Sequence, residues 1–164
     1  MATGERLHDY AATVTWTGPA GGATTTYAGY SREHTIAFEG KESALRGSAD
    51  RAFRGDAALV NPEELLLAAL SACHMLNYLA HCSLEGIEVL SYVDRARGVM
   101  SERGGAGRFV SVTLEPAVEI ARAADLERAS ALHGPAHDGC FIANSMNFPV
   151  VHRPVMRVAA SEVT

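Results

Sequence analysis

The sequence predicts an α+β fold in which an antiparallel sheet packs on a long buried central helix and a second helix. Three segments support this class: β-branched residues and turns before residue 60, an apolar helix over 61–82, and alternating apolar residues over 87–120. Strands, helix, hairpin, helix and strand in this order are typical of helices covering an antiparallel sheet. A chain of 164 residues fits one domain over 1–164, with a core over about 8–158.

The amino-terminal segment is expected to be β structure. Alternating residues predict a half-buried strand over 8–17, with Tyr10, Val14 and Trp16 on one face. Glycine and proline at 18–22 predict a turn. Two further strands are expected at 24–30 and 34–38. A long surface loop is expected at 41–58.

Residues 61–82 carry the clearest helix signal. Asn61 suits the N-cap, Pro62 suits the first helical position, and Gly86 is a suitable stop. The segment is apolar almost all round, which predicts a helix buried on most faces.

The second half alternates between strand and helix patterns. Glycines between 101 and 107 separate two strand-like segments, which predicts a long antiparallel hairpin. A second helix follows, and Pro135 is expected to bend or end its last turn. The expected elements are strands at 87–100 and 108–120, a helix at 121–137, and a closing strand at 147–156 interrupted by Pro149 and Pro154.

Composition limits the partners. The net charge of −5 and pI near 5.8, with scattered basic residues, argue against nucleic-acid binding. No secretory signal is visible, and the longest unbroken apolar run, Leu65–Leu70, is shorter than the roughly 20 residues of a membrane span. We therefore expect a cytoplasmic protein that does not bind membranes, whose cysteines stay reduced unless they react.

The three cysteines differ in their surroundings. Cys73 could simply fill the core, but polar Ser71, His74 and Asn77 interrupt its apolar helix, which favours a reactive thiol. Cys140 follows a glycine at a probable helix start, where a thiolate is stabilised. A third cysteine, Cys82, is nine residues from Cys73 and faces the opposite side of the helix, so we interpret it as structural.

Other chemistries use the same region. His133, His137 and Cys140 have spacings possible for zinc, with Asp138 as a further ligand, although no CxxC pair accompanies them. His74 and His81 also share a helix face.

A cysteine hydrolase would need Cys73 beside His133 or His137 and an orienting group. Arg51 and Arg54 fit solvated surface charge, or a guanidinium that holds a thiolate and polarises a peroxide oxygen.

Two motifs resemble one family. Asn-Pro-Glu-Glu-Leu-Leu at 61–66, followed by Ala-Ala-Leu-Ser-Ala-Cys at 68–73, is similar to the signature of the OsmC/Ohr family, named for osmotically inducible protein C and organic hydroperoxide resistance protein. Residues 136–145, Ala-His-Asp-Gly-Cys-Phe-Ile-Ala-Asn-Ser, resemble its second cysteine segment. The order of elements agrees over about residues 8–158, and the chain resembles the OsmC-like branch more than the hydroperoxide-resistance branch.

The resemblance implies a thiol peroxidase that reduces organic hydroperoxides, with hydrogen peroxide as a second candidate substrate, without metal or organic cofactor. Cys73 matches the peroxidatic cysteine, Cys140 the resolving cysteine and Glu63 the family glutamate. Arg54 is nearest to the position of the family arginine, with Arg51 and Arg32 as alternatives. The implied reductant is a dithiol such as a lipoyl protein or a small thiol. A non-enzymatic redox-sensing or small-ligand-binding protein on the same fold is the alternative function.

A homodimer is expected for two reasons. Ten residues of helix separate Glu63 from Cys73 by about 15 Å, so one arginine cannot easily reach both within a single chain. One small sheet also covers only one side of an apolar helix, and a twofold partner could cover the rest. The family resemblance implies the same intertwined homodimer.

Overall fold

A computed structural model describes residues 4–18 and 23–160, which form two compact units. Residues 1–65 make up the first unit and residues 66–164 the second, and each is described by itself. The turn expected at 18–22 lies outside the described residues except for Gly18.

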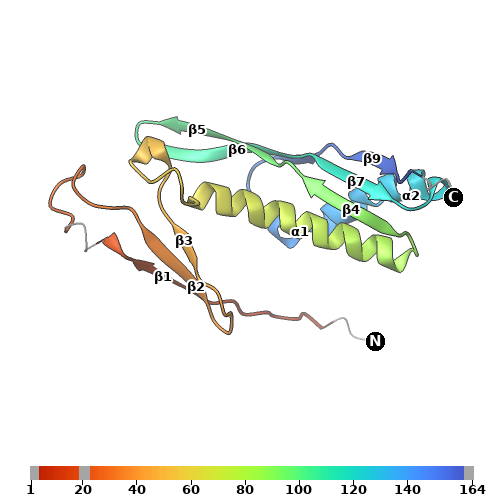
Figure 1. The fold of residues 1–164 in the computed structure, drawn as a ribbon, viewed down its shortest axis with the longest axis horizontal. Coiled ribbons are helices and arrows are strands. Elements are labelled where there is room, and N and C mark those ends of the chain that lie inside the picture. The colour runs from red at the N-terminus through yellow and green to blue at the C-terminus, as the bar shows by residue number, and fades with distance from the viewer. Residues whose placement is uncertain (1–3, 19–22, 161–164) are drawn as a thin grey trace. The chain divides into compact units, whose positions relative to one another are not determined.

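The first unit contains a three-stranded antiparallel sheet in the order β1-β2-β3 (Figure 1). Its strands are β1 (Ala12–Trp16), β2 (His34–Phe38) and β3 (Leu45–Gly47). The strands expected at 8–17 and 34–38 are thus confirmed, the first in a shorter form. The prediction that the first strand is half-buried is wrong, because all of β1 is exposed.

The strand expected at 24–30 is instead a series of turns. Gly29 N–H donates to the Thr26 carbonyl, which closes a tight turn. The Arg32 guanidinium donates to the Tyr27 and Tyr30 carbonyls, and these acceptors would otherwise serve a neighbouring strand. The β-branched composition of this segment is therefore outweighed by hydrogen bonds to a single side chain.

The loop expected at 41–58 is more ordered than predicted. It contains β3 and the short 3₁₀ helix η2 (Arg51–Phe53), which Asp50 caps by accepting the Ala52 N–H at 2.7 Å. Leu45 to Gly47 pair with β2, a partnership that their local sequence does not signal.

Helix α1 (Pro62–Leu84) begins and ends as its sequence predicts. Asn61 Oδ1 accepts the Glu64 N–H at 2.8 Å, and Glu64 Oε2 accepts the Asn61 N–H at 3.0 Å, a reciprocal capping box. After the helix, Gly86 has a φ of +67°, the left-handed conformation that glycine adopts without a Cβ penalty.

The burial of α1 differs from the prediction. Only Leu70, His74, Tyr78 and Cys82, four residues apart on one stripe, are buried in the single chain. A second stripe with the same spacing is exposed and apolar: Ala68, Ala72, Leu76, Ala80 and Leu84. By length and composition α1 could also cross a membrane, with a mean hydropathy of 1.4, a test that core helices of soluble proteins also pass.

In the second unit, α1 lies along a long antiparallel ladder (Figure 1). The ladder contains two strand pairs, β4 with β7 and β5 with β6, which confirms the predicted hairpin but divides each of its arms in two. The strands are β4 (Val89–Asp94), β5 (Arg97–Arg103), β6 (Ala106–Leu114) and β7 (Pro116–Ile120).

The closing strand is also divided, into β8 (Val150–His152) and β9 (Val155–Val158). Both pair in parallel, β8 with β6 and β9 with β7, so the predicted wholly antiparallel sheet is corrected to a mixed one. The α+β class itself is confirmed.

The helix expected at 121–137 is broken into three short pieces. They are η3 (Ala123–Asp125), α2 (Leu126–Ala131) and α3 (His133–Asp138). Pro135 lies within the first turn of α3, where its missing N–H costs nothing, so this proline accompanies a new helix rather than ending the old one.

Two core clusters of the second unit meet different ends of α1. One cluster packs Tyr78 and Cys82 of α1 against Val118 and Ile120 of β7. The other packs Leu70 against Val112 and Leu114 of β6 and against Cys140. Cys73 lies at the edge of this second cluster, which therefore holds two of the three cysteines.

Candidate active site

Cys73 lies near the middle of α1 and is only partly buried. Its position gives the sulfur a rigid helical support while leaving part of the residue accessible. The neighbouring turn of the same helix contributes Asn77, whose Nδ2 donates to the Cys73 carbonyl at 3.0 Å and lies 3.8 Å from the Cys73 sulfur.

Cys140 is the N-cap of the one-turn helix α4 (Phe141–Asn144) and is fully buried. Its Sγ accepts the Ala143 N–H at 3.5 Å, in the manner of a capping side chain. The helix start predicted at this cysteine is therefore confirmed.

The structure brings the Cys73 and Cys140 thiols together. Both side chains belong to the same core cluster, Cys73 is among the neighbours that change the pKa of Cys140, and all three cysteines of the chain are free thiols. Burial, followed by the neighbouring Cys73, raises the pKa of the Cys140 thiol to about 11, although the Ala143 N–H opposes this. Cys140 is therefore protonated at neutral pH and is suited to resolve an oxidised Cys73 rather than to attack first.

Cys82 is separate from this pair. It belongs to the other core cluster, together with Tyr78, one turn earlier on the same stripe of α1. Burial raises the pKa of its thiol, which makes it a poor nucleophile and agrees with a structural role.

Asn77 connects the cysteine pair to the segment that carries Cys140. A Cβ placed on Gly139 would lie 3.3 Å from Asn77 Oδ1, so the amide lies directly against the residue before Cys140. The sequence signal for this contact was the four-residue spacing from Cys73, which places both side chains on one helix face.

Four histidine rings form a stacked cluster beside α1. His74 Nε2 and His133 Nδ1 are 3.0 Å apart, and the His74 ring centroid lies 5.5 Å from that of His152 and 6.5 Å from that of His137. Burial, with smaller effects from neighbouring imidazoles, lowers the pKa of His74 to about 4 and of His133 to about 3. Both rings are therefore neutral at physiological pH.

This cluster does not form a metal site or a hydrolase triad in the described part of the chain. Within residues 4–18 and 23–160, no group of three or more histidine, cysteine or acidic side chains is placed to hold a metal ion. The hydrogen-bond partner found there for the Cys73 sulfur is Asn77, not a histidine. A nucleophile–base pair of the hydrolase type is thus not formed.

The charged candidates Glu63, Arg51 and Arg54 belong to the first unit. Glu63 Oε2 is buried without a hydrogen-bond partner, and no ion pair within the described ranges includes Glu63, Arg51 or Arg54. Arg54 has a φ of +67°, the single non-glycine residue with positive φ in residues 4–18 and 23–160. Strained backbone of this kind often accompanies function.

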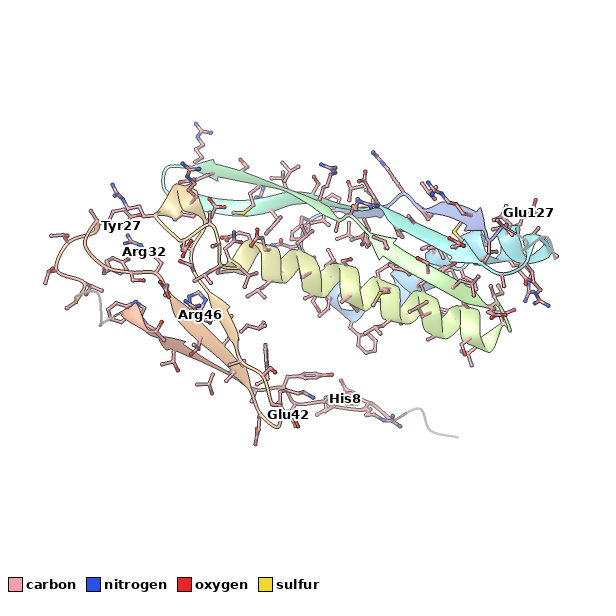
Figure 2. The ribbon with its side chains drawn as sticks, in the orientation of Figure 1. His8, Tyr27, Arg32, Glu42, Arg46 and Glu127 are labelled. Atoms are coloured by element: carbon pink, nitrogen blue, oxygen red, sulfur yellow. The ribbon has the colours of Figure 1, made fainter. Side chains whose placement is uncertain are left out.

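Arg32 is held by its own loop. Its guanidinium carbon lies 3.8 Å from the centroid of the Tyr30 ring and 4.9 Å from that of Tyr27, and its nitrogens donate to the carbonyls of the same two residues. Figure 2 shows Arg32 beside Tyr27 in this loop. These contacts give Arg32 a structural role in the loop before β2.

The chain also matches known proteins. The family model for the OsmC-like protein family matches residues 55–153. The chain belongs to the OsmC-like family. An OsmC-like protein of unknown function from Vibrio cholerae is 34% identical, with a TM-score of 0.82 over 91% of this chain and 100% of that one.

More distant structures share the OsmC-like fold. An organic hydroperoxide resistance protein from Legionella pneumophila is 17% identical, with a TM-score of 0.65 over 94% of this chain and 100% of that one. The organic hydroperoxide resistance protein OhrB of Bacillus subtilis is also 17% identical, with a TM-score of 0.61 over 93% and 100%. No curated protein sequence matches the chain significantly.

Proposed function

We propose that this OsmC-like protein is a cytoplasmic thiol peroxidase that reduces organic hydroperoxides through Cys73 and Cys140. Its family supports a role in peroxide resistance, since relatives of the same fold are organic hydroperoxide resistance proteins. The observation that carries the proposal is the pair of neighbouring free thiols in one core cluster, one partly exposed and one buried.

The proposed cycle uses both thiols in turn. The Cys73 thiolate attacks the distal oxygen of ROOH, the O–O bond breaks, and the alkoxide leaves as ROH after taking a proton. Cys73 is then a sulfenic acid, and Cys140 attacks its sulfur to form a disulfide with release of water. A dithiol, such as a lipoyl protein or a small thiol, reduces that disulfide by exchange and becomes oxidised itself.

The resting state of the pair suits this order. Cys140, with its raised pKa, keeps its proton at neutral pH and is therefore suited to act second. Partial exposure of Cys73 allows a hydroperoxide to reach its sulfur. The partly exposed apolar residues packed around the pair, including Leu67 and Ile142, favour the organic part of an alkyl hydroperoxide.

We further propose that Arg54 and Glu63 complete the site in a homodimer. The unpartnered, buried Glu63 Oε2 is suited to accept from a guanidinium, and Arg54 makes no ion pair in the part of the chain that the structure describes. About 15 Å of helix separates Glu63 from Cys73, so the dimer would bring Glu63 of one chain towards Cys73 of the other. The exposed apolar stripe of α1 supports such an interface.

Consumption of cumene hydroperoxide in the presence of dithiothreitol or dihydrolipoamide tests the proposal. The wild-type protein should turn over peroxide many times per chain. Cys82→Ser, which alters a thiol outside the pair, should retain this activity as the matched control for Cys73→Ser. If the wild type consumes no peroxide while its cysteines are reduced, the peroxidase proposal is wrong and a non-enzymatic sensing or binding function is favoured.

A further inference from the structure

We propose that Asn77 is the hydrogen-bond donor that stabilises the charged form of the Cys73 sulfur. This inference deepens the proposed function, on which its catalytic meaning rests, and it concerns a neutral residue rather than the charged candidates. The Nδ2 atom of Asn77 lies 3.8 Å from Cys73 Sγ, within the range of an N–H···S hydrogen bond. The same atom also donates to the Cys73 carbonyl at 3.0 Å.

The Asn77 amide has a neighbour on each side. On the helix, the carbonyl of Cys73 holds Nδ2 one turn from the reactive residue. Opposite, Oδ1 lies against Gly139, where even a Cβ would meet it at 3.3 Å. In this arrangement the nitrogen of the amide faces Cys73 and its oxygen faces Gly139.

This geometry is suited to a thiolate. An amide N–H close to a sulfur stabilises the anion more than the neutral thiol, because a hydrogen bond to the charged form is stronger. Asn77 has two N–H groups, so one can keep the Cys73 carbonyl while the other turns to the sulfur. The hydrogen bond that the structure gives to the Cys73 sulfur comes from this amide.

The pH dependence of Cys73 alkylation tests this role without any peroxide. Iodoacetamide modification of Cys73, read by peptide mass spectrometry on the full chain, gives the apparent pKa of this thiol alone. Asn77→Leu should raise that pKa by about one pH unit and slow alkylation at neutral pH about tenfold. Asn77→Asp, nearly isosteric, should slow it further, because a carboxylate repels the thiolate.

Asn144→Asp is the matched control. The Asn144 amide donates to the Asp138 carbonyl at 2.9 Å rather than to the sulfur. Asn144→Asp therefore introduces the same charge away from this hydrogen bond, and the alkylation profile of Cys73 in this variant should match that of the wild type. Circular dichroism establishes which variants fold. If Asn77→Leu does not fold, the alkylation profile of Asn77→Asp decides the outcome. An unchanged alkylation pKa in a folded Asn77 variant would overturn the proposal, even if stability falls. Because alkylation does not depend on turnover, absence of peroxidase activity would refute the proposed function and leave this test intact.

Discussion

At the scale of single residues, the two thiols of the pair have different environments, from which we predict different roles. Cys140 is buried with a raised pKa, whereas Cys73 is partly exposed and receives a hydrogen bond from Asn77. Nucleophilic attack depends on the thiolate, so the more accessible sulfur with more donors should react first. The sequence alone places Cys73 and Cys140 in family motifs, but it does not show that the two side chains are neighbours in the fold.

Cys73→Ser should abolish peroxide turnover, because a serine hydroxyl remains protonated and is a far weaker nucleophile. Cys140→Ser should still allow Cys73 to react once and should trap a sulfenic acid, which dimedone labelling detects. Retention of wild-type turnover by Cys73→Ser would contradict the assignment of the peroxidatic residue.

The buried histidines predict a loss of stability in acid. Their folded-state pKa values, about 4 for His74 and 3 for His133, are below the value near 6.5 of an unfolded histidine. Between pH 6.5 and 4 the unfolded chain therefore binds protons that the folded chain cannot, so stability falls as pH falls.

Thermal unfolding measured from pH 7.5 to pH 4.5 should show this decline in Tm. The double variant His74→Gln with His133→Gln should lose part of the pH dependence, whereas His8→Gln, at an exposed position, should keep it. Equal pH dependence in the wild type and the double variant would show that these rings are not responsible.

At the scale of elements, local signals explain part of the fold. Helix α1 was predictable because its cap, its first proline and its terminal glycine act through neighbouring residues. The parallel pairing of β8 and β9 was not, because the partner of a strand lies far along the chain and leaves no local pattern. The histidine cluster was missed for the same reason, since its rings come from α1, α3 and β8.

Asn61→Ala tests the capping box that begins α1. The variant loses the side-chain acceptor for the Glu64 N–H and should reduce the free energy of unfolding by about 1 kcal/mol. Asn147→Ala, at an exposed position outside any helix, is the control and should change it little. Urea unfolding at one fixed protein concentration measures both, and equal stability of Asn61→Ala and the wild type would contradict the role of the cap.

At the scale of the whole molecule, the exposed apolar stripe of α1 predicts a homodimer. Leu76 is 62% exposed and Leu84 is 85% exposed in the single chain, an unfavourable arrangement unless a partner covers them. Light scattering at micromolar concentration should give twice the chain mass of 17.4 kDa. Leu76→Glu should shift the population towards monomer, while Leu90→Glu, on β4 outside the stripe, should not.

The dimer proposal also predicts complementation between inactive variants. Glu63→Ala and Cys73→Ser proteins should each have little activity, but mixing them under subunit exchange should restore some, because one of the two sites in a heterodimer is intact. Proven exchange without any recovery would contradict a site shared between subunits.

Disulfide mapping shows whether peroxide oxidises Cys73 and whether Cys140 then resolves the oxidised Cys73. The reduced protein is treated with one equivalent of cumene hydroperoxide, remaining thiols are alkylated, and peptides are identified by mass spectrometry. We expect a Cys73–Cys140 disulfide as the main product, with Cys82 alkylated as a free thiol. A peroxide-treated protein in which Cys73 and Cys140 both remain free, or in which Cys82 carries the oxidation, would contradict it.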